Sequence, residues 1–141
     1  MATINPYLNF PGNTEEAFNF YRSIFGGDFA MIQRFGDTPE AGTTSEADKN
    51  KLMHIALPIG PNVLMATDAI GDMCTALKPG NNISLSVSAD SKEEADNIFN
   101  GLAAGGTVKM PMDNTFWGSY FGMVDDKFGV QWMVSFDAPQ K

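Results

Sequence analysis

The two halves of the chain contain the same helical pattern. Residues 13–29 read NTEEAFNFYRSIFGGDF, and residues 91–108 read SKEEADNIFNGLAAGGTV. Each stretch has apolar residues at i, i+3, i+4 and i+7 and then a Gly-Gly pair, which is typical of an amphipathic helix ending at glycine. The predicted apolar faces consist of Ala17, Phe20, Tyr21 and Ile24 in the first helix and Ala95, Ile98, Phe99 and Leu102 in the second.

Each predicted helix also has its own start and stop signals. A Ser or Asn followed three residues later by Glu has the spacing of a capping box, and Gly-Gly favours a left-handed helix end. These residues are Asn13 with Glu16 and Gly26–Gly27 in the first helix, and Ser91 with Glu94 and Gly105–Gly106 in the second.

One strand-like run precedes each helix, and three follow it. INPYLNF and NISLSVS come before the helices. FAMIQRF, KLMHIALPI and NVLMATDA follow the first helix, and TVKMPM, SYFGMV and VQWMVSF follow the second. Short apolar runs separated by turn-forming residues indicate strands. The chain is therefore predicted to be α+β, with tandem βαβββ repeats that form curved sheets around a cleft.

The length of 141 residues fits one domain, 1–141, made of two modules. We expect the modules at about 1–70 and 82–137, with a linker at 71–81. Residues 37–50 are polar and have no apolar period, so they are predicted to be a surface loop. A module of about 65 residues buries too little surface to be very stable alone.

Charge and composition exclude several classes of partner. The net charge is -8, and the basic residues are scattered, which argues against a nucleic-acid partner. The apolar runs are far shorter than the ~20 residues that cross a bilayer, so no membrane partner is expected. The N-terminus has no leader pattern, and the single Cys74 cannot form an internal disulfide. We therefore predict a cytoplasmic protein.

Sequence motifs for metal or phosphate chemistry are absent. The chain has one His and one Cys, with no H-x-x-x-H, C-x-x-C or phosphate-loop spacing, so no metal or other cofactor is predicted. His54 could act as a general base, and Asp68 lies at a predicted strand end. These are the catalytic candidates, although a structural histidine and a turn-forming aspartate explain the same residues.

Alternation along the strands predicts which side chains contact a ligand. In LMHIAL, His54 lies opposite the fully apolar face of Met53, Ile55 and Leu57. In the last strand, Trp132 is predicted to be core and its neighbours to face the cleft. An aromatic group precedes the seventh strand, where it forms either a lid or a second small core. The predicted ligand-binding residues are His54, Met65, Phe116, Trp117, Tyr120, Gln131 and Met133.

The segments at 6–29, 53–69 and 115–136 resemble the vicinal oxygen chelate superfamily, which includes glyoxalase I, extradiol dioxygenases and bleomycin-binding proteins. The match is closest to its PhnB-like branch. The resemblance implies a homodimer and metal ligands on the first and last strand of each repeat. The corresponding positions are Pro6 or Tyr7, Met65 or Thr67, Asn82 or Ser84, and Met133. Most of these are poor ligands for a hard divalent cation.

Two functional hypotheses remain open. In the first, a PhnB-like, bleomycin-resistance-type protein binds a small molecule in an apolar cleft without the usual metal site. In the second, a metal-dependent glyoxalase-like lyase/isomerase or dioxygenase uses atypical ligands, with His54 as base and Asp68 or a recruited metal as electrophilic partner. A homodimeric scaffold without a ligand is a third option. Methyl transfer is not expected, because no S-adenosylmethionine-binding glycine loop is present.

Overall fold

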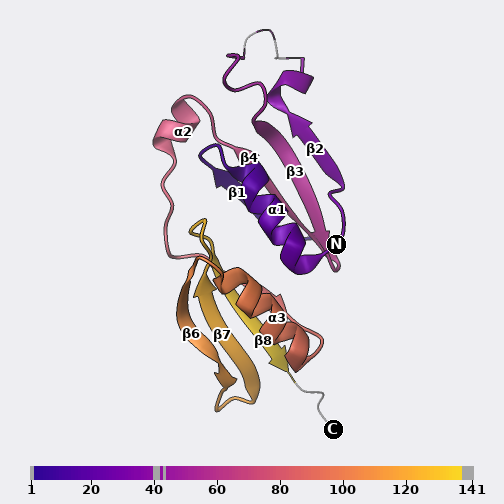
Figure 1. Cartoon of the computed structure of the whole chain (residues 1–141), viewed down its shortest axis with the longest axis vertical. Coiled ribbons are helices and arrows are strands. Elements are labelled where there is room, and N and C mark those ends of the chain that lie inside the picture. The colour runs from indigo at the N-terminus through magenta and orange to yellow at the C-terminus, as the bar shows by residue number, and fades with distance from the viewer. Residues whose placement is uncertain (1, 40–41, 43, 138–141) are drawn as a thin grey trace. The chain divides into compact units, whose positions relative to one another are not determined.

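The computed structural model describes residues 2–39, 42 and 44–137. The chain divides into two compact units, Met1–Lys78 and Pro79–Lys141. Each unit has a four-stranded mixed sheet with one long helix packed against it (Figure 1). The boundary between the units falls inside the predicted linker 71–81.

The first unit contains β1 (Tyr7–Phe10), α1 (Thr14–Phe25), β2 (Met31–Arg34), a 3-10 turn η1 (Phe35–Asp37), β3 (Leu52–Ile59), β4 (Asn62–Asp68) and α2 (Asp72–Ala76). Its strand order is β1-β4-β3-β2, with β1 parallel to β4. α1 packs on β3 and β4. The short helix α2 was missed in the predicted linker, because its five residues have no apolar period. The predicted loop 37–50 contains turns, and its residues 40, 41 and 43 lie outside the described residues.

The second unit contains β5 (Leu85–Ser88), α3 (Lys92–Ala103), β6 (Thr107–Asn114), β7 (Ser119–Asp125) and β8 (Gln131–Asp137). Its strand order is β5-β8-β7-β6, with β5 parallel to β8, so it repeats the topology of the first unit. α3 packs on β6, β7 and β8. The predicted α+β class and the tandem βαβββ pattern are confirmed.

The two long helices start in different ways. Ser91 Oγ accepts a hydrogen bond from Glu94 N at 3.0 Å, as predicted, although the Glu94 carboxylate accepts from Asp90 N instead of completing the capping box. Asn13 makes no side-chain cap. At α1 the acceptor is Asp68 Oδ1, 2.9 Å from Thr14 N. The N-terminus of α1 is thus capped from β4 and not by its own neighbouring residue.

The predicted apolar face is right for α3 and partly wrong for α1. All four predicted residues of α3 are buried. In α1, Ala17 and Tyr21 are buried, but Phe18 is fully buried and Phe20 and Ile24 are only half-buried. Thr14 is also buried, so the buried face of α1 follows the helical spacing 14, 17, 18 and 21. Phe18 packs edge-on against Tyr21, with ring centroids 5.6 Å apart.

Candidate functional site

His54 and Met65 lie on the face of the first sheet that is opposite α1. Ile55 and Leu57 of β3 are fully buried beneath the helix, and alternation places half-buried His54 on the other face. Met65 pairs with Tyr7 across β1 and β4. The Tyr7 hydroxyl lies 3.4 Å from His54 Nδ1, and the two ring centroids are 5.8 Å apart. Tyr7 therefore lies beside His54 and Met65. It is one of the two first-strand positions, Pro6 or Tyr7, that the family resemblance implied.

Asp68 lies on the helix-facing side of the first sheet and is not brought to His54. Its side chain is 3% exposed. Asp68 Oδ1 accepts from Thr14 N at 2.9 Å, and Oδ2 accepts from Leu52 N at 2.8 Å. A buried carboxylate held by two backbone N–H groups joins α1 to β3 and β4. Asp68 therefore has a structural role, and its catalytic pairing with His54 stays a prediction that these hydrogen bonds do not support.

Met133 lies on the face of the second sheet that is opposite α3. It pairs with Met123 of β7 and with Ser86 of β5. The fifth-strand position is therefore Ser86, and not Asn82 or Ser84, because β5 begins only at Leu85. Met123 was missed by the sequence analysis, although alternation in SYFGMV places it on the same face as Phe121.

The neighbours of Met133 in β8 have structural roles. Gln131 shares its face, and the Gln131 side-chain amide donates to the Ile83 carbonyl at 2.6 Å, which fixes the chain before β5. Trp132 is 3% exposed, and its Nε1 donates to Asp126 Oδ2 at 2.8 Å. The prediction that Trp132 belongs to the core is confirmed.

Phe116 and Trp117 extend from the turn between β6 and β7. Phe116 is 98% exposed and Trp117 is 56% exposed. The Trp117 ring meets Phe121 edge-on at a centroid distance of 5.9 Å, and Phe116 at 5.0 Å. Gly118 has a φ of 93°, and Ser119 N donates to Thr115 Oγ1, so the turn has a defined backbone, while the contact with Phe121 orients the Trp117 ring.

A pocket of about 400 Å³ opens beside these rings. Its wall is formed by the turn and by the adjoining part of β6, with Phe121 from β7. Its lining includes Met110, Pro111, Asp113, Phe116, Trp117 and Phe121. Asp113 is the charged member of this wall, and its Oδ1 accepts from Asn114 N at 2.8 Å. The pocket is thus mainly aromatic and thioether in character.

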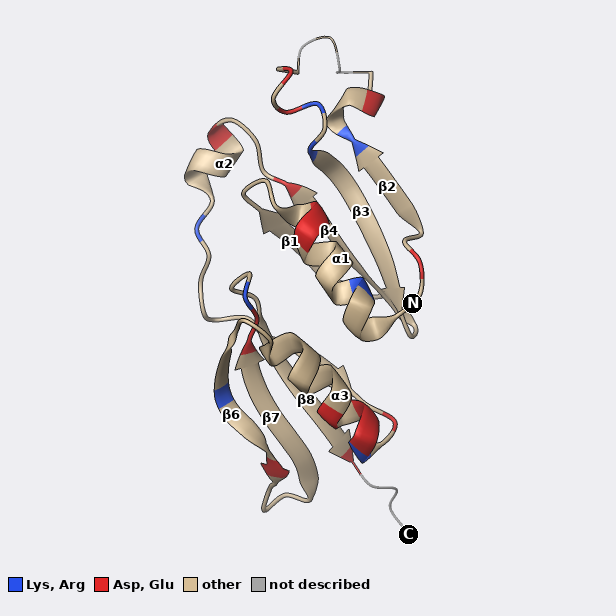
Figure 2. Cartoon of the chain, viewed as in Figure 1, with Lys and Arg blue, Asp and Glu red and all other residues tan. Residues whose placement is uncertain are grey.

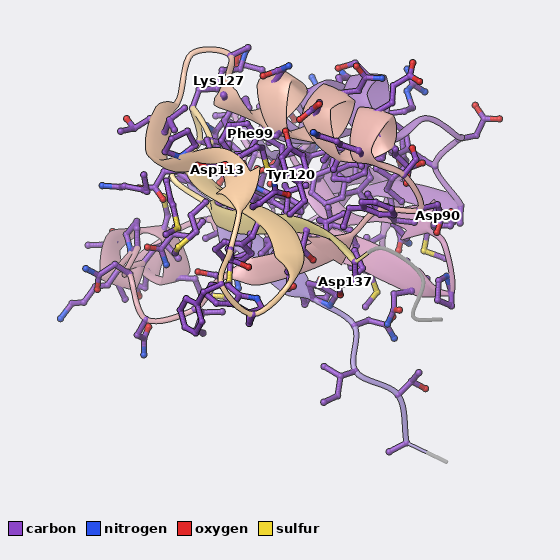
Figure 3. All side chains as sticks on the ribbon, turned by 90° about the horizontal axis from the view of Figure 1, so that it is seen from below. Asp90, Phe99, Asp113, Tyr120, Lys127 and Asp137 are labelled. Carbon is purple, nitrogen blue, oxygen red and sulfur yellow. The ribbon has the colours of Figure 1, made fainter. Side chains whose placement is uncertain are left out.

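Tyr120 points away from this pocket. Its hydroxyl donates to Asp96 Oδ1 of α3 at 2.6 Å, and Lys92 Nζ lies 4.7 Å from its ring centroid. Figure 3 shows Tyr120 and Phe99 on the side of the sheet that carries α3. The hydrogen bond to Asp96 raises the pKa of the Tyr120 phenol. Tyr120 therefore joins α3 to the sheet. The aromatic residue that lies beside Trp117 is Phe121, and not Tyr120 as the sequence analysis predicted.

Charge and metal ligands are sparse near these residues. Figure 2 shows that the middles of β7 and β8 are uncharged, and Asp125 and Asp137 stand at their ends. Within the described part of the chain, no three His, Cys, Asp or Glu side chains are grouped so that they could hold a metal ion. None of the described helices is long and apolar enough to cross a membrane.

The repeated strand order and helix placement are those of the glyoxalase/bleomycin-resistance-like fold. A glyoxalase/bleomycin resistance/dioxygenase family enzyme from Burkholderia phytofirmans PsJN has this fold, with a TM-score of 0.62 and 17% identity over 94% of this chain and 97% of that chain. The chain belongs to the PhnB-like family whose model is described as 3-demethylubiquinone-9 3-methyltransferase, which matches residues 2–135.

Three relatives resemble the chain along nearly its whole length. Protein PA1353 from Pseudomonas aeruginosa is 42% identical, with a TM-score of 0.83 over 97% of this chain and 98% of that chain. The PhnB protein from Bacillus cereus is 29% identical, with a TM-score of 0.75 over 96% and 99% of the two chains. Protein YjdN from Escherichia coli K12 is 29% identical over 94% of this chain and 93% of its own length.

Proposed function

We propose that this protein binds a small molecule with an aromatic or apolar group, without the metal site of the superfamily's enzymes. The observation that carries the proposal is the exposed Trp117 ring, packed edge-on against Phe121 beside a pocket of about 400 Å³. Ligand sites are concave and mostly apolar, with a few polar groups that orient the ligand. Exposed aromatic rings that are already held in place lose little entropy when they bind.

The wall of the pocket indicates the chemistry of its ligand. A flat ring can stack on Trp117, and the thioether of Met110 makes favourable contacts with aromatic edges. The carboxylate of Asp113 at the wall favours a ligand that carries a hydrogen-bond donor or a positive charge beside its ring. The net charge of -8 attracts such a ligand over a longer range.

The proposal also gives a ligand-binding role to predicted residues on the sheet face opposite the long helix in each unit. His54 and Met65 supply an imidazole and a thioether on the face opposite α1, and Gln131 and Met133 lie on the corresponding face of the second unit. The test of this part is a His54→Ala, Met133→Ala double variant. Unchanged affinity of that variant for every ligand found would contradict a role of these two residues in binding.

We also propose a cytoplasmic homodimer. The edge strands β2 and β6 carry exposed apolar side chains, with Met31 52% and Ile32 43% exposed in β2 and Val108 46% and Met110 43% exposed in β6. Unpaired edges with such residues favour association with a second chain. Size-exclusion chromatography with light scattering tests this part, and a monomer at micromolar concentration would contradict it.

The first experiment is a thermal-shift screen of the purified protein with organic ligands and divalent ions, preceded by elemental analysis. We expect stabilisation by aromatic, donor-bearing molecules and no stoichiometric metal. Stoichiometric Zn, Ni, Fe or Mn, or a large shift with one of these ions alone, would instead support the metal-dependent glyoxalase-like hypothesis with His54. Methyl transfer is not part of the proposal, because the glycine pairs follow α1 and α3 and do not precede them.

A further inference from the structure

Three methionines form a row across neighbouring strands of the second sheet. Met110 of β6 pairs with Met123 of β7, which pairs with Met133 of β8. Residues that are paired directly across strands share a face, so all three side chains lie on the face opposite α3. Met110 is 43% exposed, and Met123 and Met133 are half-buried. We call these three residues the methionine row.

The methionine row differs from a methionine that fills the core. Met112 belongs to the same strand as Met110, but its sulfur lies where a side chain on Gly122 would be, next to Phe99 of α3. Met112 therefore packs beneath α3 and compensates for the missing side chain at Gly122. The members of the row lie on the face opposite α3, so none of them packs beneath that helix as Met112 does.

The spacing of the strands lets the three sulfur atoms approach one point. Paired residues have Cβ atoms about 4.5–5.5 Å apart, and a methionine side chain has three rotatable bonds. The two outer side chains can therefore lean over Met123, which lies between them. The pairing of β6 shifts on both sides of Met110, between Val108 and Met110 and between Met110 and Asp113. Such irregularities bend a strand and redirect a side chain.

Three neutral thioethers form a soft donor set. Thioethers are poor ligands for hard cations, and they select Cu(I) among biological metals. Residues 79–141, which make up the second unit, contain no His or Cys, so the thioethers are the soft donors that this unit itself offers. We propose that Met110, Met123 and Met133 bind one Cu(I) ion per chain. This site shares two residues with the small-molecule proposal: Met110, which also lines the pocket, and Met133, which is a proposed ligand contact.

The test is an anaerobic competition between the protein and a chromophoric Cu(I) chelator. Cys74→Ser serves as the background, so that the single thiol cannot bind the metal. We expect one Cu(I) per chain, and a loss of affinity of about tenfold or more in Met123→Leu, which removes the central sulfur but keeps the volume. Met112→Leu is the matched control and should retain the affinity of the background protein. Circular dichroism establishes that both variants are folded.

X-ray absorption at the copper edge provides a second readout. The proposal predicts sulfur ligands only, together with thermal stabilisation by Ag(I), a redox-inert soft cation, that Met123→Leu loses. The proposal is overturned if the chelator removes all Cu(I) from the background protein, if Met123→Leu and Met112→Leu bind equally, or if nitrogen or oxygen ligands dominate the spectrum. If the background protein binds Cu(I) but binds no aromatic ligand, the proposed pocket is overturned and this site is supported.

Discussion

Replacing Asp68 tests whether this buried carboxylate is structural. The Asp68→Ala variant loses two buried hydrogen bonds, to Thr14 N at 2.9 Å and to Leu52 N at 2.8 Å. Hydrogen bonds to a charged acceptor contribute about 1.5–3 kcal/mol each, and the two donors would be left without that acceptor. The carboxylate also interacts favourably with the N-terminus of α1. We expect the free energy of unfolding to fall by about 3–5 kcal/mol.

A smaller loss is expected for Asp68→Asn, about 2 kcal/mol, because the amide oxygen can accept from one N–H but its NH₂ group repels the other. The assay is urea unfolding followed by far-ultraviolet circular dichroism, with thermal unfolding as a check. At about 3 °C per kcal/mol, Asp68→Ala should melt roughly 10 °C lower than the parent protein.

The matched control is Asp28→Asn, which removes an exposed carboxylate from the same unit. It should change stability by less than about 0.5 kcal/mol. A loss below about 1 kcal/mol in Asp68→Ala would refute the structural role. Loss of ligand binding by a fully folded Asp68→Asn would instead restore Asp68 as a residue of the site.

Two further predictions concern the second unit. Tyr120→Phe should lose about 1 kcal/mol at pH 8 in urea unfolding, because the hydroxyl donates to Asp96 Oδ1 at 2.6 Å. The hydrogen bond raises the pKa of this phenol from its ordinary value of 10.0. The stabilisation is therefore present below pH 10.0 and disappears as pH rises through the folded-state pKa. A stability difference between Tyr120→Phe and the parent that persists when the phenol is ionised would contradict this prediction. Gly106→Ala should lose several kcal/mol of unfolding free energy in the same assay, because a Cβ there would collide with the Asp125 carbonyl. The control Gly80→Ala should be close to neutral, because its Cβ would lie 3.7 Å from an Asn82 side-chain atom. Equal urea midpoints for the two variants would contradict the clash.

Most of the fold could be predicted from the internal repeat in the sequence. A periodic apolar face and a glycine end are local properties, and they located α1 and α3 and the strands that surround them. In α3 the predicted face was right because its polar residues leave one apolar stripe. α1 has apolar side chains at Phe18, Phe20 and Ile24, which allow two helical stripes, and contact with the sheet selects the stripe with Phe18.

The differences at the candidate site have one long-range cause and one local cause. The cap of α1 comes from Asp68, which is 54 residues away from Thr14 in the sequence, so capping-box spacing at Asn13 could not reveal it. Alternation was a sufficient signal for Phe121 and Met123, but grouping aromatic residues by sequence proximity placed Tyr120 with Trp117. In a strand, neighbours in sequence point to opposite faces, so proximity misleads there.

The central claim is that a small molecule binds beside Trp117, and isothermal titration of a ligand from the thermal-shift screen tests it most directly. The parent protein is compared with Trp117→Ala, in which the buried Trp132 remains as a fluorescent probe of the intact core. We predict at least about tenfold weaker binding in the variant, which corresponds to loss of about 1.4 kcal/mol from ring stacking and apolar contact. Equal affinity of the two proteins for every ligand would contradict the claim.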